Sequence, residues 1–182
     1  MTMLLAGLTI WYAAHLFQRV MPGVRARMGD KGKGVIALLI LVSVALMVLG
    51  YRAAPYEHLW DRPAWGTIVN NLMMILALYF TSPGPKKGAL FYGLRHPMLM
   101  GVAIWAIAHI IVNGDFASAI LFGGLWLWTL VEIRVINRSE PEWTPNPKGD
   151  IKKDAMFFGI SILLVGLIGS LHMLFGLSPF GG

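Results

Sequence analysis

Residues 35–51 read VIALLILVSVALMVLGY, a stretch without a single charged side chain. An α-helix needs about 20 predominantly apolar residues to cross the hydrocarbon core of a bilayer, and this stretch approaches that length. Comparable uncharged stretches recur along the 182-residue chain, at residues 1–18, 64–82, 97–114, 116–131 and 155–182. The pattern indicates a membrane protein built from several helices.

Composition supports this interpretation and excludes several classes of protein. Apolar residues make up 57% of the chain and charged residues 13%, whereas a soluble domain averages about a quarter charged residues. Almost no sequence remains for an aqueous domain, so the formal net charge of +6 does not point to a soluble enzyme or a nucleic-acid-binding protein. Cysteine is absent, which excludes disulfides, iron–sulfur clusters and thiolate metal sites. Metal or redox chemistry must therefore use histidine.

The predicted fold is all-α, a bundle of six transmembrane helices that forms one domain over residues 1–182. Prolines mark several helix ends, since proline removes a backbone donor, and Asp115 is expected to cap the fifth helix. The first stretch lacks a basic start, so we expect a retained helix rather than a cleaved leader. The hydrophobic runs place the six helices at about residues 2–21, 34–53, 64–81, 95–113, 115–136 and 154–176.

Basic residues are distributed unequally between alternate loops. Of the 15 Lys and Arg residues, 13 flank the first, third and fifth predicted loops, and only Arg52 and Arg62 flank the second. Cytoplasmic loops of membrane proteins carry the excess of Lys and Arg. We therefore expect the odd-numbered loops in the cytoplasm and both termini on the outer side of the membrane.

Two of the five histidines, His15 and His109, lie within apolar helices. An ionisable group is costly there, so both are candidates for a functional site. At about 1.5 Å rise per residue, their depths in the membrane differ by only several Å. Two facing imidazoles could bind one metal ion or haem iron between helices. The alternative is that each histidine donates to a nearby backbone carbonyl and binds nothing.

Haem fits this pair better than zinc does. No carboxylate or third histidine is expected at comparable depth to complete a tetrahedral zinc site, whereas haem needs at most two axial protein ligands. Gly101 leaves room for a flat ligand, and Trp105 lies one turn before His109. Arg19 and Arg95 could pair with haem propionates. The alternatives are close helix packing for the glycine and interfacial anchoring for the two arginines.

The stretch RHPMLMG, residues 95–101, is the most distinctive part of the chain. Pro97 suits the first turn of a helix, where its missing N–H is harmless, so Arg95 and His96 lie at the helix entrance. We assign His96 a catalytic role in exchanging protons with the cytoplasm. It is separated from His109 by 13 residues, about 20 Å along a helix, which is too far for both to bind one iron. Interfacial anchoring is the alternative.

The RHPMLMG stretch, the following IWAIAH at 104–109 and NGD at 113–115 resemble the NnrU protein family, relatives of the 15-cis-zeta-carotene isomerase of plants and cyanobacteria. The first helix with His15, followed by a basic loop with Arg25 and Gly29, also resembles the opening of that family. The resemblance covers most of the first five helices. It implies a multi-pass protein of the bacterial inner (plasma) membrane that is associated with nitrite and nitric oxide reduction. In such a membrane, the outer side that the charge distribution assigns to both termini is the periplasm.

For the isomerase branch, the resemblance implies haem b, with ligand histidines at positions that match His15 and His109. That branch has a cysteine three residues before the second histidine, where this chain has Ala106. Ligand exchange to cysteine is therefore impossible here, which counts against carotenoid isomerisation by that route. The implied partners are the lipid bilayer, haem, and an apolar polyene or a nitrogen-oxide respiratory enzyme, without nucleic acid.

The Arg-His-Pro signature also occurs in membrane methyltransferases of the isoprenylcysteine carboxyl methyltransferase type. Those enzymes combine it with a downstream Glu-Glu pair and a tyrosine-rich C-terminal region to bind S-adenosylmethionine. Here Glu132, Glu140 and Glu142 are isolated, and no tyrosine follows Tyr92, so this is the weaker interpretation. The main hypotheses are a haem-dependent isomerase or redox protein, a non-enzymatic haem sensor or assembly factor for nitric oxide reductase, and a purely structural bundle.

Overall fold

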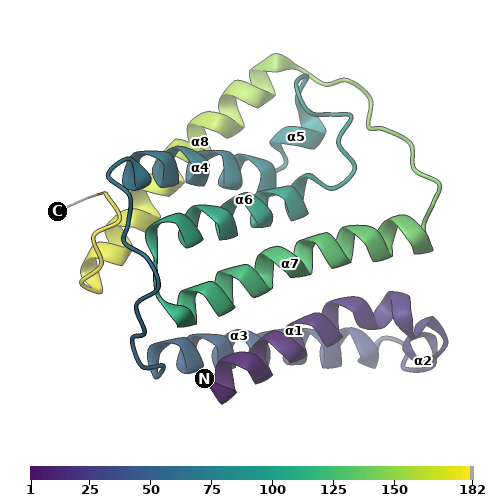
Figure 1. The fold of residues 1–182 in the computed structure, drawn as a ribbon. Coiled ribbons are helices and arrows are strands. Elements are labelled where there is room, and N and C mark those ends of the chain that lie inside the picture. The colour runs from purple at the N-terminus through teal and green to yellow at the C-terminus, as the bar shows by residue number, and fades with distance from the viewer. Residues whose placement is uncertain (181–182) are drawn as a thin grey trace. The chain divides into compact units, whose positions relative to one another are not determined.

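The computed structural model describes residues 1–180, which form eight helices and no β-strand (Figure 1). By their contacts the helices form two compact units, each assembled from two separate segments of the chain. The first unit comprises residues 1–59 and 115–141, and the second comprises residues 60–114 and 142–182. The protein is therefore all-α, as predicted, and its two units are interleaved in sequence.

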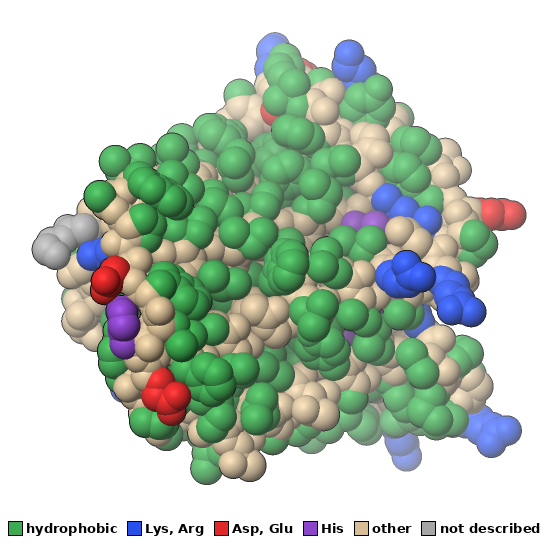
Figure 2. All heavy atoms as spheres, viewed as in Figure 1, with side chains coloured by type: hydrophobic (Ala, Val, Ile, Leu, Met, Phe, Trp, Pro, Cys, Tyr) green, Lys and Arg blue, Asp and Glu red, His purple; other side chains and the backbone are tan. Residues whose placement is uncertain are grey.

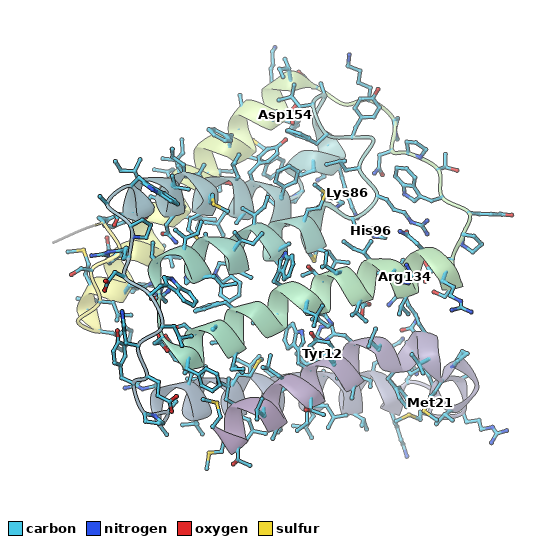
Figure 3. The ribbon with its side chains drawn as sticks, in the orientation of Figure 1. Tyr12, Met21, Lys86, His96, Arg134 and Asp154 are labelled. Carbon is cyan, nitrogen blue, oxygen red and sulfur yellow. The ribbon has the colours of Figure 1, made fainter. Side chains whose placement is uncertain are left out.

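The first unit depends on close approach between helices at small residues. A Cβ atom at Gly7 would lie 2.8 Å from the carbonyl oxygen of Ser43, so the glycine lets two helix backbones come together. The hydroxyl of Tyr12 donates to the carbonyl oxygen of Gly124 at 2.6 Å and ties the first helix to the last one of this unit (Figure 3). The helices concerned are α1 (Thr2–Val20), α2 (Pro22–Arg27), α3 (Lys31–Arg52) and α7 (Phe116–Ser139).

The turn between α2 and α3 requires a glycine. Gly29 has a φ angle of +56°, in the left-handed region that ends many helices and that residues with a Cβ atom disfavour. Its carbonyl oxygen accepts a hydrogen bond of 3.0 Å from the guanidinium of Arg25. The turn therefore fixes the position of Arg25 near the start of α3.

The second unit pairs its helices through a buried amide and a small residue. The side-chain amide of Asn70 donates to the carbonyl oxygen of Ala108 at 2.8 Å. A Cβ atom at Gly101 would lie 2.7 Å from the carbonyl oxygen of Ala77, so these helices also touch backbone to backbone. The helices of this unit are α4 (Gly66–Thr81), α5 (Gly84–Lys87), α6 (Pro97–Val112) and α8 (Ile151–Leu174).

A buried carboxylate connects α8 to α4 and to the loop after α5. Asp154 is 4% exposed and accepts hydrogen bonds from the Tyr79 hydroxyl, from the Ala89 N–H at 2.5 Å and from the Leu90 N–H at 3.3 Å (Figure 3). A Cβ atom at Gly88 would collide with this carboxylate. Asp154 is therefore the main polar tie of the second unit.

Six of the eight helices correspond to the six predicted ones, with ends that differ by a few residues. The fourth predicted helix begins at Pro97 instead of residue 95, because proline takes the first helical position. Asp115 caps α7 as predicted, since its carboxylate accepts from the Ser118 N–H at 2.9 Å. The short helices α2 and α5 were not predicted, and each has a proline in its first turn.

Three helices in the described part of the chain, α3, α7 and α8, are long and apolar enough to cross a membrane. The apolar helices α4 and α6 have 16 residues each, about 24 Å, which is shorter than the roughly 30 Å hydrocarbon core. α1 has 19 residues but carries Gln18 and Arg19 in its last turn. The prediction of a membrane protein is thus supported by three candidate spans, and the six-span arrangement stays a prediction.

Large apolar side chains are exposed along the candidate spans, as expected for surfaces that contact lipid. Hydrophobic side chains predominate on the face drawn in Figure 2. Such contiguous apolar surface is unusual for a soluble monomer. On α3 and α8 the exposed residues include Leu38, Leu41, Val48, Leu49, Ile162, Leu163, Leu167 and Leu171.

We predict that replacing Asp154 with alanine destabilises the protein by about 3 kcal/mol, because two backbone N–H groups and the Tyr79 hydroxyl lose their acceptor in a buried position. Thermal unfolding in detergent measures the effect. Asp30→Ala is the matched control, since Asp30 pairs with Lys33 at an exposed position and such pairs contribute little. Equal stability of the two variants would show that the hydrogen bonds of Asp154 do not stabilise the second unit.

Candidate functional site

His15 lies in the second half of α1, between two tryptophan rings of the first unit. Its Nδ1 is 2.9 Å from the carbonyl oxygen of Trp11, one helical turn earlier. The ring centroid of His15 lies 4.1 Å from that of Trp11 and 4.8 Å from that of Trp128 on α7. Because a carbonyl oxygen can only accept, Nδ1 carries the proton and Nε2 carries the lone pair of the neutral ring.

His109 repeats this arrangement on α6 in the second unit. Its Nδ1 is 2.9 Å from the carbonyl oxygen of Trp105, and the two ring centroids are 4.8 Å apart. Residues four apart lie on the same face of a helix, so each histidine has its tryptophan one turn before it. The sequence shows the same spacing in WYAAH (11–15) and WAIAH (105–109). This recurrence is a sequence signal that links the two histidines independently of their depth.

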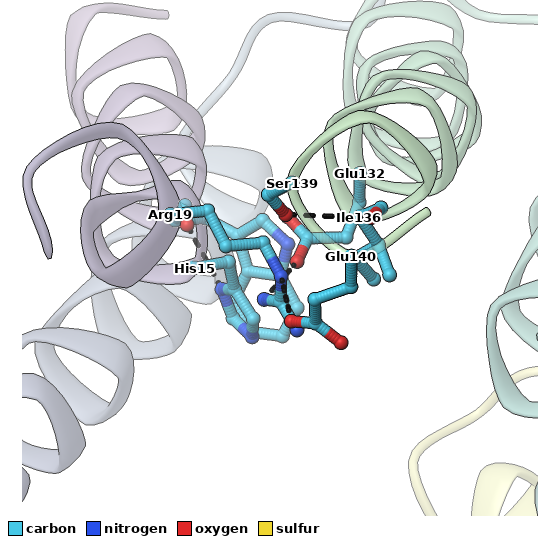
Figure 4. Close-up of polar contacts among 7 residues, drawn as sticks. His15, Arg19, Glu132, Ile136, Ser139 and Glu140 are labelled. Carbon is cyan, nitrogen blue, oxygen red and sulfur yellow. Dashed lines mark hydrogen bonds and ion pairs between the residues drawn. The ribbon is translucent and has the colours of Figure 1, made fainter. Parts of the chain in front are cut away.

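A buried ion pair lies one helical turn from His15. The guanidinium Nη1 of Arg19 is 3.0 Å from Oε1 of Glu132, and its Nε is 3.4 Å from Oε1 of Glu140 (Figure 4). The side chain of Glu132 is 6% exposed and that of Arg19 is 23% exposed. Arg19 is therefore engaged by two carboxylates, and its predicted contact with a haem propionate stays a prediction.

Glu132 corrects one expectation from the sequence. We expected no carboxylate at a depth comparable with that of His15, yet Trp128 contacts the His15 ring and Glu132 follows Trp128 by one turn of α7. The rule that selects a histidine within an apolar helix applies equally to a glutamate there. Glu132 is therefore an additional candidate site residue. The sequence could have identified it, because it is an ionisable residue within an apolar helix.

Four buried polar atoms near His15 make no hydrogen bond within residues 1–180. One is Nε of Arg19, which still has its ion-pair contact with Glu140. The other three are Nε1 of Trp11, Nε1 of Trp128 and Oε2 of Glu132. Buried polar groups in folded proteins nearly always have a partner, so each exception calls for an explanation such as a water, an ion or a ligand. The surroundings of His15 thus offer two donors and one acceptor that are suited to a bound group.

Each histidine also lines a cavity within its own unit. The cavity at His15 has a volume of about 220 Å³, and its lining includes Arg25 and Lys33. The cavity at His109 is smaller, about 60 Å³, and Asn70, Asn71 and His172 contribute to its lining. The sequence suggests no more for His172 than a place near a helix end, because only the packing of α8 on α4 brings it to this cavity.

The remaining predicted site residues lie along α6 and at its start. His96 is the N-cap residue of α6 and directly follows Arg95, so His96 and His109 sit toward opposite ends of one helix. Trp105 is in contact with His109. Gly101 faces the α4 backbone, which matches the packing alternative, and its cofactor contact stays a prediction.

Imidazole nitrogens are the metal-binding groups that the site offers. Residues 1–180 contain no group of three or more His, Cys, Asp or Glu side chains that could hold one metal ion. His15 belongs to the first unit and His109 to the second, and a shared iron between them stays a prediction. Each unit supplies one imidazole with a defined tautomer, next to a tryptophan and a cavity.

Comparison with known proteins relates nearly the whole chain to one family. The model of the NnrU protein family matches residues 3–179. No curated protein and no solved structure matches the sequence. The matched range includes both histidines with their tryptophans, the RHPMLMG stretch and the buried Glu132.

We predict strong coupling between Arg19 and Glu132. Arg19→Met leaves the carboxylate of Glu132 buried without its nearest cation, which costs about 3 kcal/mol, whereas the double variant Arg19→Met/Glu132→Met removes both charges and recovers most of the stability. Thermal unfolding of both single variants and the double variant measures the coupling. Effects that simply add would contradict a coupled buried pair. Lys33→Met, which breaks the exposed pair with Asp30, serves as the control.

Proposed function

The chain belongs to the NnrU protein family, and we propose that it is a haem b-binding protein of the bacterial inner membrane in which His15 and His109 bind the same iron. The observation that carries this proposal is that each histidine lines an open cavity while its ring is held in one orientation by its own helix. In both, Nδ1 donates to the carbonyl oxygen of the tryptophan four residues earlier. Histidines that bind metals commonly make such a second hydrogen bond, because it fixes the tautomer and the orientation of the ring.

The cavities favour a ligand over the alternative that both histidines are merely satisfied. A histidine that only bonds to its own helix needs no open space beside it, yet His15 and His109 each line a cavity. The unpartnered indole N–H groups of Trp11 and Trp128 lie near His15. When bound, haem would supply an iron centre for one-electron redox chemistry, and the imidazole nitrogens of His15 and His109 would hold it.

The residues of the chain have distinct proposed roles around this group. His15 and His109 hold the iron, and Trp105 packs against His109 and restricts rotation of its ring. His96, at the N-terminus of α6, exchanges protons with the aqueous phase. Arg95 is proposed to contact a propionate carboxylate from the loop before α6.

The proposed activity is haem-dependent redox chemistry in nitrite and nitric oxide reduction. Isomerisation of an apolar polyene is the related enzymatic alternative. Ala106 is fully buried and stands where a cysteine would be needed for thiolate exchange. This residue favours a respiratory role, including that of a non-enzymatic sensor or assembly factor for nitric oxide reductase, over isomerisation by ligand exchange.

Contacts within each unit support a topology of six spans with both termini in the periplasm. In the first unit, Arg19 at the end of α1 pairs with Glu140 just beyond α7, so the first and fifth loops lie at one end. In the second unit, the Gly149 N–H donates to the Gly88 carbonyl oxygen at 3.0 Å, which joins the third and fifth loops. The second loop and the turn after α6 meet in the bridge between residues 58 and 115. Within each unit the basic loops therefore lie together, in agreement with the charge rule.

We predict that the detergent-purified protein retains a Soret band, and that His15→Ala or His109→Ala shifts or abolishes it. The reason is that each variant removes one axial nitrogen. Absorption spectra of the oxidised and reduced protein measure this, with His58→Ala as the control on an exposed loop. His96→Ala should keep most of the haem and lose catalytic turnover or physiological activity.

Two outcomes would contradict this proposal. A wild-type protein without a Soret band would refute haem binding altogether. An unchanged spectrum of the His109→Ala variant would remove that residue from the site while leaving haem binding intact.

The topology is tested separately. An exported phosphatase fused to the C-terminus should be active, while a cytoplasmic fluorescent reporter at the same position should stay dark, because basic loops are retained in the cytoplasm. Fusions to the loop at Lys86 should give the opposite result. Fluorescence from the C-terminal fusion would overturn the orientation.

A further inference from the structure

The cavity at His15 has two cations and an apolar wall. Arg25 of α2 and Lys33 of α3 provide the positive charge. A ligand that matches this lining is an amphiphile with an apolar body and an anionic group at one edge. The apolar surface comes from α1 and α3, through Ala14, Ile36 and Ile40.

Arg25 is restrained at the cavity by its surroundings. Its Nη1 donates to the Gly29 carbonyl oxygen at 3.0 Å. A Cβ atom at Gly32 would lie 2.7 Å from the same Nη1, so the guanidinium lies over the first turn of α3 where glycine leaves room. A guanidinium has five N–H donors, and the contact to Gly29 leaves donors that a carboxylate can engage in a forked pair.

Lys33 has a more flexible partner. Its Nζ lies 3.0 Å from Oδ1 of Asp30, and the two side chains are 74% and 94% exposed. Such an exposed pair is weak, so Lys33 can exchange Asp30 for an anionic ligand at little cost.

Arg19 differs from these two residues, although it lies only one turn from His15. Its guanidinium is engaged by the buried Glu132 at 3.0 Å and by Glu140 at 3.4 Å. An anion that approached Arg19 would meet two negative charges, one of which has almost no access to water. The anion-binding end of the His15 site is therefore on the side of Arg25 and Lys33.

We propose that Arg25 and Lys33, rather than Arg19, bind one propionate carboxylate of the haem whose iron His15 holds, in addition to the contact proposed for Arg95. This inference rests on the proposed function, and it assigns the orientation of the ligand within the first unit. This carboxylate would be held at the turn between α2 and α3, and Ile36 and Ile40 of α3 would provide apolar contacts for the macrocycle.

The test compares haem with its dimethyl ester, in which both carboxylates lose their charge. Affinities of the full-length apoprotein for the two compounds are measured in detergent by the Soret band. The wild-type protein should bind haem at least about tenfold more tightly than the ester, because the ester cannot form charge-assisted hydrogen bonds with the two cations. Arg25→Gln and Lys33→Gln should each reduce this preference several-fold without moving the Soret maximum, because the axial nitrogens are unchanged.

Matched controls come from the same turn. Arg27→Gln and Lys31→Gln remove the same charge from exposed positions that do not line the cavity, and both should keep the wild-type preference. Loss of the preference in the Arg27 or Lys31 variants would show that the preference for haem over its ester depends on the total charge of the loop and not on the cavity. That result would overturn the proposal.

The remaining outcomes separate this proposal from the proposed function. Equal binding of haem and its ester by the wild-type protein would overturn the role of Arg25 and Lys33 while haem binding stands. That comparison needs no substitution, so a variant that fails to fold does not affect it. Absence of binding to either compound would refute both proposals together.

Discussion

A polar group surrounded by hydrocarbon must find its hydrogen-bond partner within the chain, because the bilayer core offers no water. The interior of this protein follows that constraint at almost every position. The hydroxyls of Ser43, Thr129 and Ser161 each donate to a backbone carbonyl of their own helix at 2.7 to 2.8 Å. Asp154 collects donors from two other segments, and the imidazoles of α1 and α6 bond to the preceding turn. The unpartnered atoms near His15 are significant because they depart from this constraint.

The fold could be predicted from the sequence where one kind of signal dominates. Hydrophobic length located the long helices, and the Asp115 cap followed from a short acceptor before an apolar run. The short helices α2 and α5 were not predicted from the sequence. They have six and four residues, with a proline in the first turn of each, and a helix this short shows no hydrophobic periodicity. The shortness of α4 and α6 has a similar cause, since the uncharged stretches run past both helices into their loops.

The candidate site could also be predicted only in part, because the sequence identifies single residues but not the tertiary contacts between them. The cost of a charge in an apolar helix selects His15 and His109 from the sequence, and it selects Glu132 with equal force. What the sequence does not reveal is the pairing: that Glu132 neutralises Arg19, and that basic residues of α2 and α3 share a cavity with a histidine of α1. In the sequence these basic residues serve only as topology signals. Their contacts depend on how α1, α2, α3 and α7 pack.

The interleaving of the two units has a consequence for synthesis of the protein. The chain passes from one unit to the other at residues 59–60, 114–115 and 141–142. A ribosome delivers the chain from its N-terminus, and domains that occupy one continuous segment can fold as they emerge. Here the first unit cannot be completed until α7 has been made, and the second cannot be completed until α8 has been made. The helices α4 and α6 are therefore synthesised before the first unit is complete, and they lack α8 at that time. Neither unit can therefore be completed before α7 has been made, and a ribosome that stalls before α7 releases a chain in which neither unit is finished.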